Sequence, residues 1–282
     1  MIHVKNLSVK FGKFSAVDHL TLNVRAGELF GFLGPNGAGK TTTIKVLTGA
    51  IVPNDGNIEI NGLNLQKQFS EIKKIIGYVP DTENHIEDFT GRENLTLYAK
   101  LYQAPLKRVD EWLANLQLSE AADLKVASYS KGMKKKLLIA RELLHSPKLV
   151  FFDEPTANLD AHSIQLVRQL LRNLTKQGTT VFLTTHDMAE VEQICDRVAI
   201  LAKGKLIACE TPTAFITKHA ERFCDVQFDE NNQIVRQTFH LDHASDRETL
   251  ANIIQTKHCV RVHSREFCFE DVFKKLTGEV YT

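Results

Sequence analysis

The sequence has few cysteines, and their spacing does not indicate a metal or redox site. There are five in 282 residues, an odd number, and no two are spaced as Cys-x-x-Cys. Such pairs are the usual sign of a zinc site or a redox motif, and an even set is typical of a disulfide framework. We interpret all of them as reduced thiols of a cytosolic protein: Cys195, Cys209, Cys224, Cys259 and Cys268.

Long apolar runs and an excess of charge are also missing. A membrane span needs about 20 mostly apolar residues, whereas an apolar run such as LVFF at 149–152 is far shorter, and the first 14 residues alternate in polarity, unlike a leader peptide. Any role at a membrane would therefore depend on a partner. The net charge of +1 and the isoelectric point near 7.7 argue against attraction of the whole chain to nucleic acid.

Strand-like and helix-like segments alternate along most of the chain, which predicts a mainly parallel sheet with crossover helices. A stretch without strand signal at about 90–145 predicts a helical insertion, and the polar, histidine-rich tail predicts a small mixed appendage from about residue 213. The tail histidines are expected to be surface residues rather than metal ligands. The expected strands are 2–9, 20–24, 28–33, 75–79, 149–152, 180–183 and 198–201, with a hairpin at 52–62 turning at 54–56 and helices at 34–49, 163–176 and 188–194.

Residues 34–41 fit the pattern G-x-x-x-x-G-K-[ST] between a buried strand and a helix, and we call them the phosphate loop. Its glycines let backbone N–H groups curl around phosphate oxygens at a helix N-terminus. Lys40 would reach the outer phosphates, and the Thr41 hydroxyl would bind Mg²⁺. A chance glycine turn is the alternative, against which the flanking strand and helix argue.

Two apolar strands deliver polar side chains at the edge of a parallel sheet where ligands usually bind. KLVFFDEP ends in Asp153, a candidate Mg²⁺ ligand, and Glu154, a candidate base for the attacking water. TVFLTTHD ends in His186, which would contact the terminal phosphate. The alternatives are an ordinary acid pair at a helix start and a structural histidine.

Together with these motifs, SYSKGMKKKL at 128–137 resembles the ATP-binding cassette (ABC) ATPases, in the subgroup that serves type-two exporters, over residues 1–215. The family's LSGGQ turn aligns with 129–133, here called the signature turn, where Lys131 replaces a glycine and Met133 a glutamine. The resemblance implies that Ser130 and the Gly132 N–H contact ATP held by a second copy's phosphate loop. The lysines after Met133 would then form an exposed helix face, and nucleic-acid binding is not expected.

The resemblance also assigns other positions. Phe11, with Val17 nearby, would stack on adenine, although a core phenylalanine is the alternative; NLD at 158–160 would connect two copies. Asp81 replaces the usual glutamine that touches Mg²⁺ or the attacking water. The expected cofactors are ATP and Mg²⁺, the metal ligands are Thr41, Asp81 and Asp153, and the nucleotide contacts are Phe11, Val17, Asn36, Gly37, Ala38, Gly39, Lys40, Thr41, Thr42, Ser130, Gly132 and Asp160.

The predicted fold class is α/β: a P-loop NTPase core with a mainly parallel sheet, an antiparallel β subdomain, a helical insertion and a C-terminal α+β appendage. The expected domains are an ABC ATPase at 1–212, with its helical subdomain at about 85–145, and an accessory domain at 213–282, whose FEDVFKKLTG also resembles exporter ATPases. The implied protein is an ATPase on the cytoplasmic face of the cell membrane. The resemblance implies that it pairs with itself or a related ATPase and powers a separate permease, and the subgroup implies export. Alternatives are a soluble nucleotide-gated module acting on ribosomes or DNA, and a P-loop kinase.

Overall fold

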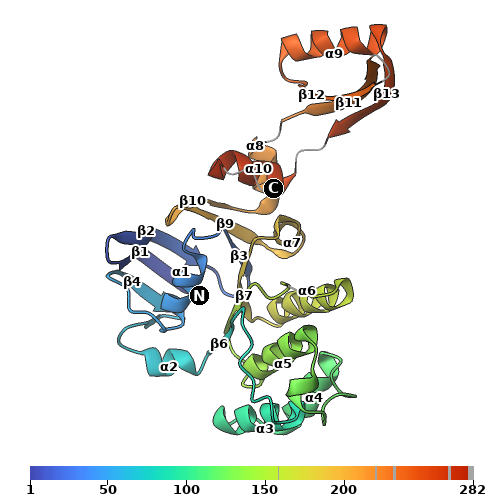
Figure 1. Ribbon diagram of the computed structural model, residues 1–282. Coiled ribbons are helices and arrows are strands. Elements are labelled where there is room, and N and C mark those ends of the chain that lie inside the picture. The colour runs from blue at the N-terminus through green and yellow to red at the C-terminus, as the bar shows by residue number, and fades with distance from the viewer. Residues whose placement is uncertain (158, 220, 231–232, 266–267, 279–282) are drawn as a thin grey trace. The chain divides into compact units, whose positions relative to one another are not determined.

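The structure is a computed structural model that describes residues 1–157, 159–219, 221–230, 233–265 and 268–278 (Figure 1). The chain divides into two compact units, Met1–Glu210 and Thr211–Thr282. Within the described residues, none of the helices combines the length and the apolar character that crossing a membrane requires.

A six-stranded sheet forms the centre of the first unit, in the order β10-β9-β3-β8-β7-β6. Five strands run parallel, and only β10 is antiparallel to its neighbour β9. The mainly parallel sheet predicted from the sequence is confirmed, whereas β10 was not predicted. The strands are β3 (Leu29–Leu33), β6 (Ile76–Val79), β7 (Leu149–Asp153), β8 (Thr180–Thr185), β9 (Arg197–Ala202) and β10 (Lys205–Glu210).

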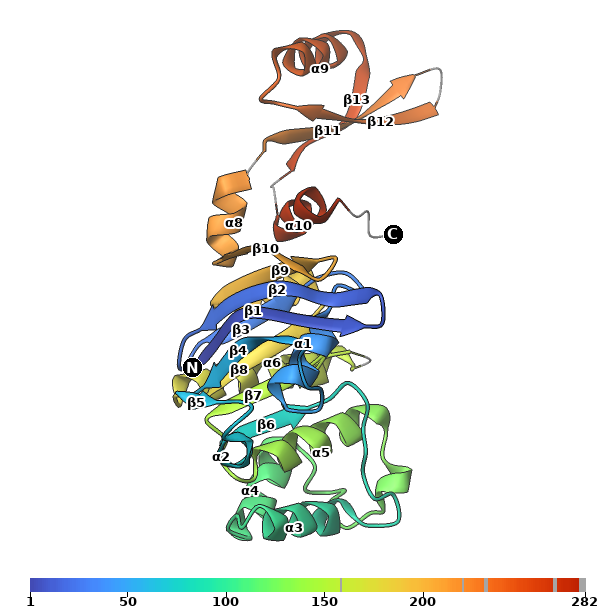
Figure 2. The same ribbon diagram turned by 90° about the vertical axis from the view of Figure 1, so that its left-hand side faces the viewer.

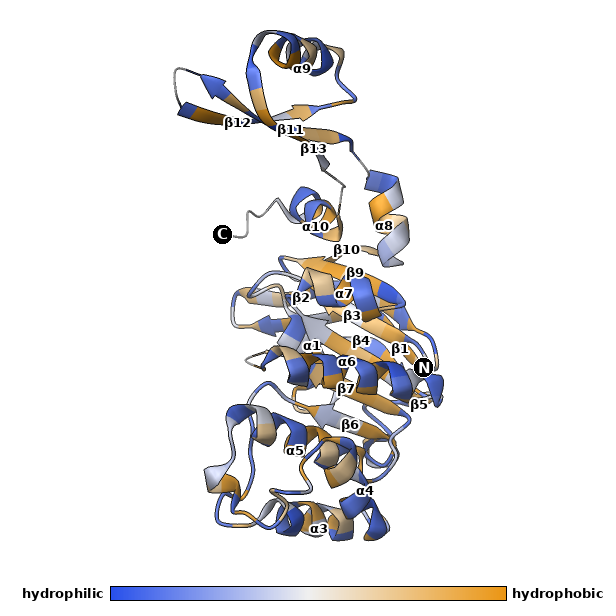
Figure 3. Ribbon diagram, turned by 90° about the vertical axis from the view of Figure 1, so that its right-hand side faces the viewer, coloured by the Kyte–Doolittle hydropathy of each residue, from blue (hydrophilic) through white to orange (hydrophobic). Residues whose placement is uncertain are grey.

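Aromatic side chains of three neighbouring strands pack against one another in the core of this unit. The Phe182 ring of β8 lies 5.6 Å from Phe30, 5.1 Å from Phe32 and 5.5 Å from Phe151, measured between ring centroids, and all four are fully buried. α6 (Ala161–Lys176) and α7 (Met188–Ile194) cover one face, with polar residues turned outward (Figure 3). α1 (Lys40–Leu47) lies on the other face. The packed layers fix the carboxyl ends of the parallel strands at one edge.

A four-stranded antiparallel sheet, in the order β2-β1-β4-β5, packs in the same hydrophobic core (Figure 2). Its strands are β1 (Ile2–Phe11), β2 (Phe14–Val24), β4 (Asp55–Ile60) and β5 (Leu63–Asn64). The predicted hairpin turn at 54–56 is wrong, because Asp55 and Gly56 lie inside β4. The chain reverses at Asn61 and Gly62, whose φ angles of 53° and 78° suit the two-residue turn that joins antiparallel strands.

The predicted helical insertion is present between β6 and β7. It contains α3 (Gly91–Leu101), α4 (Lys107–Asn115), the 3₁₀ turn Val126–Ser128 and α5 (Lys131–Leu143), and a short helix, α2 (Phe69–Lys73), precedes β6. α3 begins with a capping box between Thr90 and Glu93. Ser130 caps α5 by accepting a hydrogen bond from the Met133 N–H at 3.2 Å. These caps fix where the two helices begin.

The second unit has its own sheet and core. The three-stranded antiparallel sheet has the order β12-β11-β13, and α9 packs against it. Rings of Phe215 and Phe269 pack edge to face at 5.6 Å between α8 and α10. The elements are α8 (Pro212–His219), β11 (Phe223–Glu230), β12 (Gln233–His240), α9 (Ala244–Thr256), β13 (His258–Arg265) and α10 (Phe269–Thr277), and the sheet core is Cys224, Val226, Phe228, Phe239, Leu250 and Ile253.

Candidate active site

The phosphate loop joins the end of β3 to the start of α1. Gly39 is the N-cap of α1 with φ 104°, and a Cβ there would lie within 3.0 Å of the Ala16 carbonyl oxygen. The Lys40 ammonium, in a residue only 8% exposed, donates to the carbonyl oxygens of Gly34 at 2.5 Å and Pro35 at 3.1 Å. The Lys40 side chain thus crosses back over the loop to its first two residues. The curled backbone of the loop requires glycine at position 39.

A cleft of about 350 Å³ opens over this loop. It brings together the loop, the β1–β2 hairpin and the ends of β6 and β7, although these are far apart in the sequence. A phosphate cradle, two aromatic rings and three carboxylates therefore share one space. The lining residues are Phe11, Phe14, Ala16, Asn36, Gly37, Gly39, Lys40, Thr41, Thr42, Asp81, Asp153 and Glu154.

Two predicted nucleotide contacts in or near the phosphate loop have side chains that do not line the cleft. The Val17 side chain is fully buried in the core, so the prediction that it faces the base is corrected, and Ala16 lines the cleft instead. The Ala38 side chain is also buried. Phe14, which the sequence reading missed, is 61% exposed, and it pairs with Phe11, 52% exposed, at the tip of the β1–β2 hairpin. The sequence FGKF, in which two phenylalanines flank a two-residue turn, could have indicated that both rings lie side by side at the hairpin tip.

The acids at the end of β7 are held by the neighbouring strand β8. Asp153, 4% exposed, accepts a hydrogen bond from the Thr184 hydroxyl at 2.5 Å. Glu154 has φ 50° and donates its N–H to the Thr184 carbonyl oxygen at 3.0 Å. Its Oε2 lies 2.9 Å from Nδ1 of His186. These contacts fix the Glu154 carboxylate at the edge of the sheet, within reach of a ligand in the cleft.

The three cleft carboxylates offer the oxygen ligands that Mg²⁺ prefers, with room for water and phosphate. Burial, together with the negative charges of Asp153 and Asp81, raises the pKa of Tyr78 to about 12. Among the described residues, no group of three or more His, Cys, Asp and Glu side chains is placed to hold a metal by itself. The donor set of Thr41, Asp81 and Asp153 fits a cation that takes its other ligands from a nucleotide and water.

The signature turn does not line this cleft. Ser130 caps α5, and Asp160 caps α6 by accepting from the Ser163 N–H at 2.9 Å. A Cβ on Gly132 would lie 3.5 Å from Leu159 and 4.0 Å from an Asp160 carboxylate oxygen, so the signature turn and the Asp160 loop are neighbours. Asn158, the first residue of the predicted NLD motif, lies outside the described residues. One chain therefore carries two separate surfaces of the predicted site.

The prediction that the lysines after Met133 form an exposed helix face is wrong. Lys135 is 2% exposed and Lys136 is 8% exposed. The Lys135 ammonium donates to the carbonyl oxygens of Pro80 at 2.9 Å and Asp81 at 3.1 Å. The segment after β6 crosses α5 at this point, so the Lys135 ammonium meets backbone rather than water. The fully apolar run LLIA that follows them was the signal of a helix buried on several sides.

A buried acid that the sequence reading also missed lies behind the Glu154 loop. Glu190 on α7 is fully buried and accepts a hydrogen bond from the Thr156 hydroxyl at 3.1 Å. Its other oxygen lies 3.6 Å from Nε of Arg168, and neither atom has a hydrogen-bond partner. Burial raises the pKa of Glu190. This acid therefore connects α7, which follows His186, to the turn that follows Glu154.

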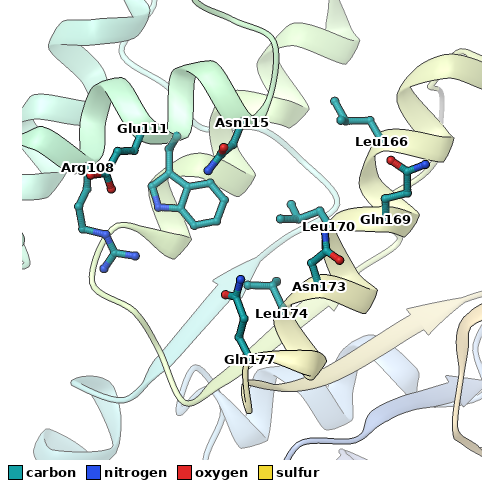
Figure 4. Close-up of a pocket in the computed structure, with 10 residues that line it drawn as sticks. Arg108, Glu111, Asn115, Leu166, Gln169, Leu170, Asn173, Leu174 and Gln177 are labelled. Carbon is teal, nitrogen blue, oxygen red and sulfur yellow. The ribbon is translucent and has the colours of Figure 1, made fainter.

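A second cavity, of about 360 Å³, lies between α4 and α6 (Figure 4). Trp112 lines it. Arg108 and Glu111 from the same helix lie across from Leu170 and Asn173 of α6 and from Gln177, the residue that follows α6. It shares no lining residue with the cleft over the phosphate loop. The nucleotide motifs of the sequence all lie outside it.

A glycine-rich phosphate loop between a parallel strand and a helix, with acids at the ends of neighbouring strands, defines the class of P-loop nucleotide hydrolases. The helical insertion and its signature turn narrow that class. Residues 17–157 match the family described as ABC transporter. The chain belongs to the ABC transporter family, as the motifs predicted, and is an ATPase of that family.

Similar proteins cover nearly the whole chain. A fluoroquinolones export ATP-binding protein of Mycobacterium tuberculosis is 33% identical over 100% of this chain and 95% of that protein. The bacitracin transport ATP-binding protein BcrA of Bacillus licheniformis is 39% identical over 86% of this chain and 80% of its own. A Nod factor export ATP-binding protein I of Burkholderia lata is 35% identical, covering 98% and 97%.

Solved structures agree with the fold. The ATP-binding subunit of an ABC transporter superposes with a TM-score of 0.72 and 31% identity, over 77% of this chain and 92% of that chain. A dimeric, post-hydrolysis ATP-binding cassette bound to ADP and Pi superposes with a TM-score of 0.69 and 28% identity, over 75% of this chain and 98% of that chain. The predicted fold class is confirmed.

Proposed function

We propose that this chain is the ATP-hydrolysing subunit of an exporter, in which two copies bind head to tail around two ATP molecules and drive a separate membrane permease. The observation that carries the proposal is the separation of the phosphate loop from the signature turn within one chain. Each surface is half of a site. A second copy, or a related ATPase, would supply the missing half, and the export relatives and the solved cassette dimer support this arrangement.

The residues of the cleft have distinct roles in this proposal. The backbone N–H groups of the phosphate loop and the Lys40 ammonium bind the phosphates, while Phe11 and Phe14 receive the base. Thr41, Asp81 and Asp153 would hold Mg²⁺, which would offset the charge that develops on the phosphates. The phosphates, the base and the metal ion are thus each bound by a different set of side chains, so a substitution in one set leaves the other two sets intact.

Glu154 orients and deprotonates the attacking water, and His186 contacts the terminal phosphate while its Nδ1 faces Glu154. On the second copy's side, Ser130 and the Gly132 N–H reach the terminal phosphate, and Asp160 lies beside them. The helix N-terminus of α5 adds partial positive charge there. Hydrolysis would weaken this bridge between copies and let them separate.

Substitution of Glu154 tests the assignment of the base. Glu154→Gln keeps the size and polarity of the side chain but cannot take a proton, so we expect the rate of ATP hydrolysis to fall about 10²- to 10⁴-fold. ATP binding should persist, and ATP should hold the variant as a dimer in size-exclusion chromatography. Glu192→Gln, the same change at an exposed site on α7, is the matched control. A Glu154→Gln protein that hydrolyses ATP at the parent rate would refute the role of Glu154.

Co-purification tests the partner. The chain is tagged in its native cells, the membranes are solubilised gently, and the bound proteins are identified by mass spectrometry. We expect a polytopic membrane protein in about equal amount, and the protein peripheral on the inner face of the membrane. Recovery of ribosomal or DNA-bound proteins without a membrane protein would favour the soluble nucleotide-gated module instead.

A further inference from the structure

The segment that follows β6, residues 80–87, is fastened along α5 by side chains of that helix. Near its far end the Lys134 ammonium lies 2.6 Å from a Glu87 carboxylate oxygen. The Arg141 guanidinium donates to the Asn84 side-chain oxygen at 2.8 Å and to the Asn84 carbonyl oxygen at 3.3 Å. The segment therefore follows the helix rather than forming a free loop.

Lys135 fastens the start of the segment, at the cleft itself. Its ammonium donates to the carbonyl oxygens of Pro80 and Asp81, at 2.9 Å and 3.1 Å, and the residue is 2% exposed. The Asp81 carboxylate lines the cleft. Because the carbonyl and the carboxylate belong to the same residue, fixing the backbone of Asp81 limits where its carboxylate can go.

Lys135 also lines a small cavity together with Asp81 and Glu83. Burial lowers its pKa, and the opposing negative charges of Asp81, Glu83, Asp153 and Glu154 raise it, in that order of strength. A buried ammonium needs such partners, because an unpaired charge in the interior is costly. Lys135 thus lies beside Asp81, whose carboxylate lines the cleft.

We propose that Lys135 is a positioning residue for ATP hydrolysis, which holds the backbone at Asp81 so that its carboxylate stays in the cleft beside Asp153. The proposal rests on the proposed function of the cleft. It gives Lys135 a role in ATP hydrolysis, whereas the sequence suggested only an exposed helix face or a nucleic-acid-binding patch for the lysines after Met133. Lys135 does not line the cleft and acts through Asp81.

Backbone exchange tests the fastening without reference to catalysis. In Lys135→Met the long apolar stem is kept and the two hydrogen bonds are lost. The Tyr78 N–H, two residues before Pro80, donates to a Glu142 carboxylate oxygen at 3.3 Å. We expect hydrogen–deuterium exchange of this amide in the nucleotide-free full-length chain to rise at least about tenfold above that of the parent, because the segment that follows it is no longer held. The matched control is Lys136→Met, because Lys136 is similarly buried but makes no hydrogen bond or ion pair within the described part of the chain. Equal exchange in the two variants would overturn the proposal.

A double-mutant cycle then tests the link to the reaction. Lys135→Met should lower kcat about 10- to 100-fold with little change in the KM for ATP, since a small misplacement of a catalytic group has effects of this size. In an Asp81→Ala background the same substitution should lower kcat no further, because the carboxylate that it positions is gone. Lys135→Arg should retain most of the rate. Independent, multiplicative losses, or a Lys135→Met protein with the parent kcat, would refute the positioning role.

The two tests separate this proposal from the proposed function. If the parent chain, alone and with its co-purified partner, does not hydrolyse ATP, the proposed function fails while the exchange experiment still decides whether Lys135 fastens the segment. Exchange across β3, β7 and β8 shows whether each variant is folded. If Lys135→Met does not fold, Lys135→Gln replaces it in both measurements, because its polar side chain is one bond shorter and falls short of the two carbonyl oxygens that the ammonium reaches.

Discussion

Replacing Gly39 with alanine should destabilise the first unit more than the same change at Gly37, two residues earlier in the phosphate loop. Both have positive φ angles, 104° and 78°, which cost an alanine about 1–3 kcal/mol. Only at Gly39 would the new Cβ also meet backbone, within 3.0 Å of the Ala16 carbonyl oxygen, whereas nothing lies within 4 Å at Gly37. Overpacking of this kind costs about a further 1–3 kcal/mol.

We therefore expect Gly39→Ala to lower the free energy of unfolding by about 2–6 kcal/mol, and Gly37→Ala by about 1–3 kcal/mol. The loss of unfolded-state freedom is common to both and cancels in the comparison. For a unit of this size, the further loss of stability expected for Gly39→Ala over Gly37→Ala corresponds to a Tm lower by about 2–12 °C. Trp112 is the chain's only tryptophan and is buried in the first unit, so its fluorescence in urea follows that unit. Equal losses in the two variants would refute the close approach at Ala16.

Two further predictions concern the stacking of the nucleotide base on Phe14 and the buried acid Glu190. Phe14→Ala should weaken ATP binding about 5- to 150-fold, because stacking on an aromatic ring is worth about 1–3 kcal/mol; displacement of a fluorescent nucleotide measures it, with Phe89→Ala, an exposed ring outside the cleft, as control. An unchanged Kd would exclude stacking on Phe14. Burial raises the pKa of Glu190 above its ordinary 4.5, so the folded state binds the proton more tightly than the unfolded state and this group's contribution to stability falls as pH rises through that window. Relative to the parent, Glu190→Gln should gain stability in urea titrations from pH 4 upward, and a pH-independent difference would contradict this.

The parts of the fold that the sequence predicted are those in which local pattern and burial coincide. Strands such as β7 and β8 are buried on both faces, and their short apolar runs ending in polar residues identify both the strand and its position at the active edge. The phosphate loop was predictable for a similar reason, since its glycines, Lys40 and Thr41 act within eight consecutive residues.

What the sequence did not predict depends on contacts between distant segments. The burial of Lys135 results from residues 80–87 crossing α5, and the position of Phe14 beside Phe11 results from the register of the β1–β2 hairpin. Glu190 looks like an ordinary helix glutamate until α7 packs over Thr156. The tertiary neighbour, rather than the spacing along the chain, decides each of these environments.

The left-handed backbone of Glu154 affects how this protein can evolve. A residue with a side chain at φ 50° pays a conformational cost that glycine would avoid, and here it stands immediately before Pro155. A substitution that relaxed this backbone would also remove the carboxylate from the sheet edge. Selection for a more stable chain and selection for a faster one therefore act in opposite directions at this position, and variants selected only for heat resistance would tend to lose the acid first.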